Sequence, residues 1–99
     1  MSETLRDAID RALDAYAALG ERGEEIEDDW SYVTELGEAW EARFEAIRSG
    51  RGDEVVTPAT SAALTAAIEE IGRIDDPHRA IDWLSTFPQV ILVAIGERP

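Results

Sequence analysis

Residues 24–49 read EEIEDDWSYVTELGEAWEARFEAIRS and carry the most regular apolar pattern of the chain. Large apolar side chains recur in alternating steps of four and three residues, with a glycine at the one skipped place. The positions are Ile26, Trp30, Val33, Gly37, Trp40, Phe44 and Ile47. A repeat of about 3.5 residues is typical of one side of an α-helix. The pattern therefore predicts one long, central amphipathic helix over about residues 24–48.

Two starts are open for this helix. If it begins at Glu24, the acidic residues of its first turns complement the positive end of the helix dipole. If it begins after Asp28 or Asp29, either aspartate is a good N-cap for Trp30, and Ile26 lies outside the helix. At the other end, the sequence Ser-Gly-Arg-Gly-Asp at 49–53 predicts that the helix stops and a loop follows.

Three further helices are predicted on both sides of this segment. Residues 3–19 have apolar side chains at helical spacing, and Gly20 is a plausible stop, so 20–23 is predicted to be a turn. The first turn can be capped by Ser2 or by Thr4 with Asp7. The face opposite the apolar stripe is predicted to be a mixed solvated face, with Arg6, Asp7, Asp10, Arg11 and Asp14. Thr57-Pro58 and Asp76-Pro77 each combine a capping side chain with proline at the first helical position.

The segment from Val90 to Ile95 is apolar throughout and admits two interpretations. Its β-branched residues favour a strand, but a single strand in a helical chain would leave its backbone groups unpaired. We expect a short buried helix that begins at Pro88, where the preceding helix is broken or kinked, and ends at Gly96. A strand would have to pair with its twin across a dimer.

We therefore predict an all-α fold, a compact bundle of four to five helices in a single domain over residues 1–99. The long helix exceeds its neighbours, which suggests a two-fold homodimer. Its interface would use either this helix or the C-terminal apolar segment.

Composition limits the function classes. The chain has 9 basic and 22 acidic residues, a net charge of −13, and no cysteine. Such a surface repels nucleic-acid phosphate and anionic lipid, so we expect no direct nucleic-acid or membrane partner. The N-terminus lacks a basic-then-apolar signal region, which favours a cytoplasmic location. All basic residues are arginine, a pattern explained by a GC-rich genome or a salt-rich cytoplasm; the alternative is an acidic DNA mimic.

Chemistry-bearing residues are few. His78 is the only histidine, and Asp82 and Asp75 share its helical face without completing a metal site. Glu38, Glu41 and Glu45 form an acidic row that is most simply a solvated face. Magnesium bound by such carboxylates would define the alternative function, a nucleotide-hydrolysing enzyme.

One family motif bears on that alternative. Residues 24–28, Glu-Glu-Ile-Glu-Asp, resemble the first half of the magnesium motif of the MazG-like nucleotide pyrophosphatases, which are all-α enzymes. Their second half, Glu-x-x-Asp on a later helix, has no counterpart, since Arg73 stands where the acid would follow Glu70. We therefore assign the chain to no family and expect no catalytic site, cofactor or metal.

The aromatic residues suggest a contact surface instead, because tryptophan is enriched at protein interfaces. The candidate surface consists of Trp30, Val33, Gly37, Trp40, Phe44, Trp83 and Phe87. The predicted function is a non-catalytic interaction or regulatory module whose partners are a second copy of itself and possibly another protein.

Overall fold

Four helices make up the secondary structure of the computed structural model, which describes residues 3–24 and 30–98. They are α1 (Leu5–Glu24), α2 (Trp30–Arg51), α3 (Pro58–Gly72) and α4 (Pro77–Ala94). Apart from one isolated bridge between two residues, the described ranges contain no strand. The all-α prediction is confirmed.

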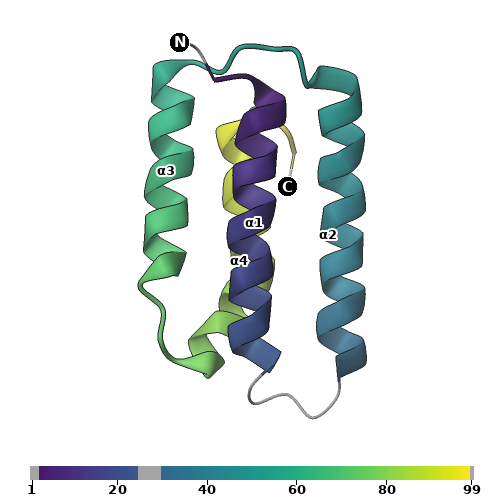
Figure 1. Cartoon of the computed structure of the whole chain (residues 1–99), viewed down its shortest axis with the longest axis vertical. Helices are drawn as coiled ribbons and strands as arrows, with labels where there is room; N and C mark the ends of the chain where they lie inside the picture. The colour runs from purple at the N-terminus through teal and green to yellow at the C-terminus, as the bar shows by residue number, and fades with distance from the viewer. Residues whose placement is uncertain (1–2, 25–29, 99) are drawn as a thin grey trace.

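The centre of the bundle is α1, which packs against all three other helices (Figure 1). α3 and α4 contact each other, whereas α2 packs mainly on α1 and has no contact with α3 in the described residues. The predicted central helix corresponds to α2, which is the longest at 22 residues but lies at one side of the bundle. The reason is burial. From residue 35 onward, Phe44 is the one buried apolar side chain of α2, whereas six apolar side chains of α1 are buried.

α1 continues past the predicted stop at Gly20, so the predicted turn over 20–23 is wrong. A glycine within a helix costs about 1 kcal/mol relative to alanine, and packing of the last turns offsets that cost. Leu19 is fully buried. Gly23 lies so close to α4 that a Cβ there would be 3.1 Å from Ile81 Cγ1.

The bounds of α2 differ from the prediction at both ends. Glu24 belongs to α1, so α2 cannot begin there. The first described residue of α2 is Trp30, a boundary that agrees with the alternative start after Asp28 or Asp29. These aspartates and Ile26 lie outside the described residues. At its C-terminus α2 continues through Ser49 and Gly50 and ends at Arg51, because one exposed glycine is too small a cost to end a packed helix.

Three helices begin with a side-chain cap that the sequence predicts. In each, a side-chain oxygen of the residue before the helix accepts a hydrogen bond from a backbone N–H of the first turn. The pairs, acceptor first, are Thr4–Asp7 at 3.3 Å, Thr57–Thr60 at 3.1 Å and Asp76–His78 at 3.0 Å. Proline follows the cap in α3 and α4, as predicted.

Residues 52–57, which we call the clamp segment, connect α2 to α3 and close over the start of α1. The first N–H groups of a helix have no partner within the helix. Two of them donate to carbonyl oxygens of the clamp segment: Leu5 to Glu54 at 2.7 Å and Arg6 to Gly52 at 3.1 Å. The clamp segment therefore fixes where α1 begins relative to the end of α2.

α4 passes through Pro88 without a break, so the predicted division into two helices is wrong. The proline removes one backbone hydrogen bond and costs a helix about 3 kcal/mol. Pro88 and its neighbours Phe87, Ile91 and Leu92 are buried in the core, and that burial offsets the cost.

The helical interpretation of Val90–Ile95 is confirmed as far as Ala94, within α4 itself. The predicted stop is also correct, since Gly96 has a φ of +84°. Its N–H donates to the Val93 carbonyl at 3.1 Å, and the Glu97 N–H donates to the Leu92 carbonyl at 2.8 Å. This pair of bonds is the Schellman motif, which favours glycine after a helix.

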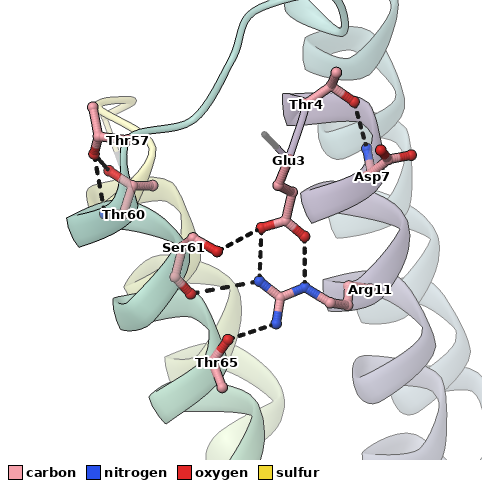
Figure 2. A network of polar contacts seen from close by, with 8 residues as sticks. All are labelled: Glu3, Thr4, Asp7, Arg11, Thr57, Thr60, Ser61 and Thr65. Carbon is pink, nitrogen blue, oxygen red and sulfur yellow. Dashed lines mark hydrogen bonds and ion pairs between the residues drawn. The ribbon is translucent and has the colours of Figure 1, made fainter. Parts of the chain in front are cut away.

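One polar network joins α1 to α3 (Figure 2). Arg11 donates from Nε and Nη2 to the two carboxylate oxygens of Glu3, each at 2.9 Å, and from Nη1 to Thr65 Oγ1 at 2.8 Å. Ser61 Oγ donates to the same carboxylate at 2.9 Å. The sequence predicts Arg11 on a solvated face, but the structure places it between two helices. Its bidentate bonds hold the Glu3 carboxylate, and the bonds of Arg11 to Thr65 and of Ser61 to Glu3 link α3 to the start of α1.

A second polar junction joins the clamp segment to the end of α2 and to the residues after α4. Arg51 donates to both carboxylate oxygens of Glu54, at 2.9 and 3.0 Å, and to Glu97 Oε1 at 2.6 Å. The guanidinium lowers the pKa of the Glu54 carboxyl, because hydrogen bonds to the ionised form favour it. The two carboxylates in turn raise the pKa of Arg51.

We expect this junction to make stability depend on pH. A lowered pKa in the folded state means that the stabilisation is present above the ordinary carboxyl value of about 4.3 and is lost as the pH falls below it. Glu54→Gln should therefore lower the melting temperature more at neutral pH than under acidic conditions, with the difference shrinking as the pH falls through the lowered pKa of Glu54, as measured by circular dichroism. Glu69→Gln, at an exposed residue with no described ion pair, should show no such change with pH.

Candidate functional site

The structure divides the predicted aromatic surface between core and periphery. Phe44 and Phe87 are 3% and 1% exposed, so both belong to the core and neither is available to a partner. Trp40 and Trp83 are partly buried and pack against that core. The side chains of Trp30 and Val33 lie outside the described part of the chain. The predicted surface therefore loses its two phenylalanines, and its remaining members stay a prediction.

Within the described part of α2, Gly37 and Trp40 are the two members of the predicted surface that remain accessible in part. A Cβ added at Gly37 would be 3.9 Å from Tyr16 Cε1, an ordinary contact, so no close helix approach requires the glycine. The indole N–H of Trp40 is buried without a hydrogen-bond acceptor among the described residues. An unpaired buried donor is unfavourable.

A groove of about 490 Å³ lies between α1 and α2. We call it the α1–α2 groove. Its apolar part is formed by Leu13 and Ala17 of α1. Its polar part consists of Asp10 and Asp14 of α1 and Glu41, Glu45 and Arg48 of α2. Four carboxylates thus face a single guanidinium.

Arg48 neutralises only part of this charge. Its guanidinium donates to Asp10 Oδ1 and, at 3.1 Å, to Glu45 Oε1. Asp14 and Glu41 have no hydrogen bond or ion pair to any other described residue, and both are exposed. Two carboxylates from different helices therefore stay free at the edge of an apolar floor.

The sequence predicts the acidic residues of α2 that line the groove, but it does not single out those of α1. Glu41 and Glu45 belong to the predicted acidic row, whereas Asp10 and Asp14 are predicted only as part of a mixed solvated face. Their four-residue spacing puts both on one side of α1. Nothing in that spacing says that α2 would lie alongside, because the pairing of two helices is a tertiary contact.

The candidates for metal or acid–base chemistry are not brought together. His78 is exposed, as are Asp75 and Asp82. Within the described residues no group of three or more histidine or acidic side chains has an arrangement suited to a metal ion. The motif at 24–28 lies outside those residues except for the backbone of Glu24.

Comparison with known proteins assigns no relatives. The chain matches no protein-family model and shows no significant similarity to a curated protein or to a solved structure. Within the described ranges, none of the helices combines the length and apolarity needed to cross a bilayer.

Proposed function

We propose that the protein is a non-catalytic interaction module that binds a basic amphipathic segment of another protein in the α1–α2 groove. One observation carries this proposal: carboxylates from two helices border a shared apolar floor, and Asp14 and Glu41 form no ion pair with any described residue. Complementary charge across an interface favours association and orients the partner.

The shape and chemistry of the groove favour a particular partner. Leu13 and Ala17 would be covered by apolar side chains, while the carboxylates would pair with arginine or lysine at the edges of the same segment. A helix with one apolar stripe between two basic edges combines both features. A fully hydrophilic polycation would leave the floor uncovered.

No feature of the described residues favours the two alternatives left open by the sequence. The magnesium-dependent enzyme relies on the acidic row of the long helix. Its described members, Glu38, Glu41 and Glu45, belong to no group of three or more acidic or histidine side chains suited to a metal ion within the described residues, and residues 25–28 lie outside them. The DNA mimic requires a continuous convex acidic face, whereas Asp14 and Glu41 border a concave groove. We therefore propose neither.

The test is a titration with a labelled amphipathic peptide of about 18 residues, long enough for five helical turns, with leucine on one side and arginine at the edges. We expect binding that weakens as NaCl rises from about 20 to about 500 mM, because salt screens exposed charges. A peptide with glutamate in place of arginine should not bind. Amide signals of Leu13 and Ala17 should shift on binding in NMR spectra.

Two double variants separate the groove from net charge. Asp14→Asn with Glu41→Gln should weaken peptide binding about three- to tenfold, since each exposed ion pair contributes up to about 1 kcal/mol. Asp82→Asn with Glu69→Gln makes the same chemical changes at exposed residues outside the groove and should leave affinity within about twofold. Equal weakening by both doubles, or no binding at low salt, would refute the proposal.

A further inference from the structure

Among the described residues that line the α1–α2 groove, Arg48 is the one basic side chain, and it holds a defined place. It donates to Asp10 of α1 and, at 3.1 Å, to Glu45, one turn earlier in its own helix. The Arg48 side chain is 30% exposed, whereas those of Asp10 and Glu45 are 50% and 62% exposed. Its guanidinium therefore bridges the two helices and does not extend freely into solvent.

This bridge makes the two ends of the groove different. α1 and α2 run in opposite directions (Figure 1). Asp14 follows Asp10 by four residues in α1, and Glu41 precedes Glu45 by four residues in α2. Because the helices are antiparallel, both steps lead the same way along the groove, by about 6 Å at 1.5 Å per residue. Asp14 and Glu41 therefore lie together, one helical turn away from the pairs that Arg48 makes.

We name the two ends by these residues. The clamp end consists of Asp10, Glu45 and Arg48 and lies toward the clamp segment, which follows the end of α2. The open end consists of Asp14 and Glu41, which form no ion pair with any described residue. The groove is thus partly neutralised at one end and fully anionic at the other.

We propose that Arg48 is a specificity-determining residue, which directs the basic side chains of the partner to the open end and excludes them from the clamp end. The inference rests on the function proposed above, because it concerns the same groove. A cation at the clamp end would have to share Asp10 and Glu45 with Arg48 and lie beside its positive charge. A cation at the open end meets carboxylates that no described residue pairs.

The groove then selects for how charge is distributed along the partner, and not only for its total charge. The preferred occupant is an amphipathic segment with its arginine or lysine residues at one end and uncharged residues one helical turn further along. Such a segment covers the apolar floor along its whole length and places its cations at the open end. Repulsion by Arg48 disfavours the reversed placement, and a repulsive element of this kind is a general source of specificity.

Two helical peptides test this selection. Both carry the same leucine stripe and one pair of arginines at its edges; the second peptide replaces two glutamines by a further arginine pair one turn along. The affinity gained from the second pair is measured by fluorescence titration at about 150 mM NaCl, where exposed charges are partly screened. In Arg48→Gln this gain should be about three- to tenfold larger than in the unmodified chain, because Asp10 and Glu45 become available. Comparing gains cancels the general attraction of a basic peptide to an acidic protein.

Arg73→Gln is the matched control. Arg73 also pairs with a glutamate three residues earlier, Glu70, at 3.8 Å, but it lies at the end of α3, outside the groove. This variant loses the same charge, and its gain should stay within about twofold of that of the unmodified chain. Arg48→Lys keeps the positive charge in the groove and should also leave the gain nearly unchanged. Arg48 and Arg73 form exposed or partly exposed pairs, so circular dichroism should show that all variants fold.

The outcomes separate this inference from the proposed function. If the unmodified chain binds the peptides but Arg48→Gln shows the same gain as Arg73→Gln, the role of Arg48 is overturned and the proposed function stands. An equal increase in Arg48→Lys and Arg48→Gln would also overturn it, because the charge would not be the cause. If neither peptide binds to any of the variants, the inference and the proposed function both fail.

Discussion

Replacing Phe87 with alanine is expected to destabilise the fold by about 3–5 kcal/mol, because it removes a large side chain from the core and leaves a cavity. Phe87 is 1% exposed and lies on α4, facing α1. Its ring stacks on that of Tyr16, with centroids 6.4 Å apart and an angle of 11° between the planes. The substitution therefore weakens the contact between α1 and α4. A small domain is stable by only about 5–15 kcal/mol, so the variant should be close to unfolding at physiological temperature.

Urea unfolding followed by circular dichroism would measure this loss, with Phe87→Leu and Val93→Ala as comparisons. Leucine keeps much of the volume and should cost less than half as much as alanine. Val93→Ala truncates an exposed side chain of the same helix and should change the free energy of unfolding by less than about 0.5 kcal/mol. A loss below about 1 kcal/mol for Phe87→Ala would mean that the ring is not a core side chain.

Gly52→Ala is expected to cost about 3 kcal/mol, at the upper end of the usual range for overpacking. A Cβ at Gly52 would be 2.3 Å from the carbonyl oxygen of Arg48 and 3.0 Å from Arg6 Nη2. The Arg6 side chain is flexible and can move away. The Arg48 carbonyl belongs to the last turn of α2 and cannot move without distorting the helix. The clamp segment would have to shift, which would also disturb its hydrogen bonds to α1.

Gly50→Ala is the matched control, two residues earlier in the same region. A Cβ at Gly50 would have no neighbour within 4 Å, and the residue is helical. Alanine there should leave stability unchanged or raise it by up to about 1 kcal/mol, because it restricts the unfolded chain and favours the helix. In thermal unfolding, the melting temperature should therefore fall for Gly52→Ala and stay the same or rise for Gly50→Ala. Equal destabilisation would indicate that the helix end, and not the contact with Arg48, is sensitive.

Sequence patterns predict the helix starts better than the helix ends. Thr57-Pro58 and Asp76-Pro77 act through bonds within four residues, so their effect is local and is confirmed. Gly96 also ends its helix through local bonds. Gly20 does not end its helix. The burial of Leu19 and the packing of α1 against α4 keep the chain helical beyond it. That contact joins residues far apart in the sequence and leaves no local signal.

The candidate site is predictable only in part, for the same reason. The spacing of Glu41 and Glu45 is visible within one helix, whereas their position opposite Asp10 and Asp14 depends on how α1 and α2 pair. The sequence predicts Phe44 on a contact surface, because an apolar stripe has the same pattern whether it faces a partner or the protein's own core. Burial decides between these alternatives, and burial is a property of the whole fold.

The clamp segment has a consequence for how this sequence can vary over evolutionary time. The bonds from Leu5 and Arg6 to its carbonyl oxygens use atoms that every residue type possesses. A lineage could therefore exchange the side chains at positions 5, 6 and 54 one by one without losing the anchor itself. Proline at position 5 or 6, which would remove a donor, and any side chain at position 52 are the changes that such drift must avoid.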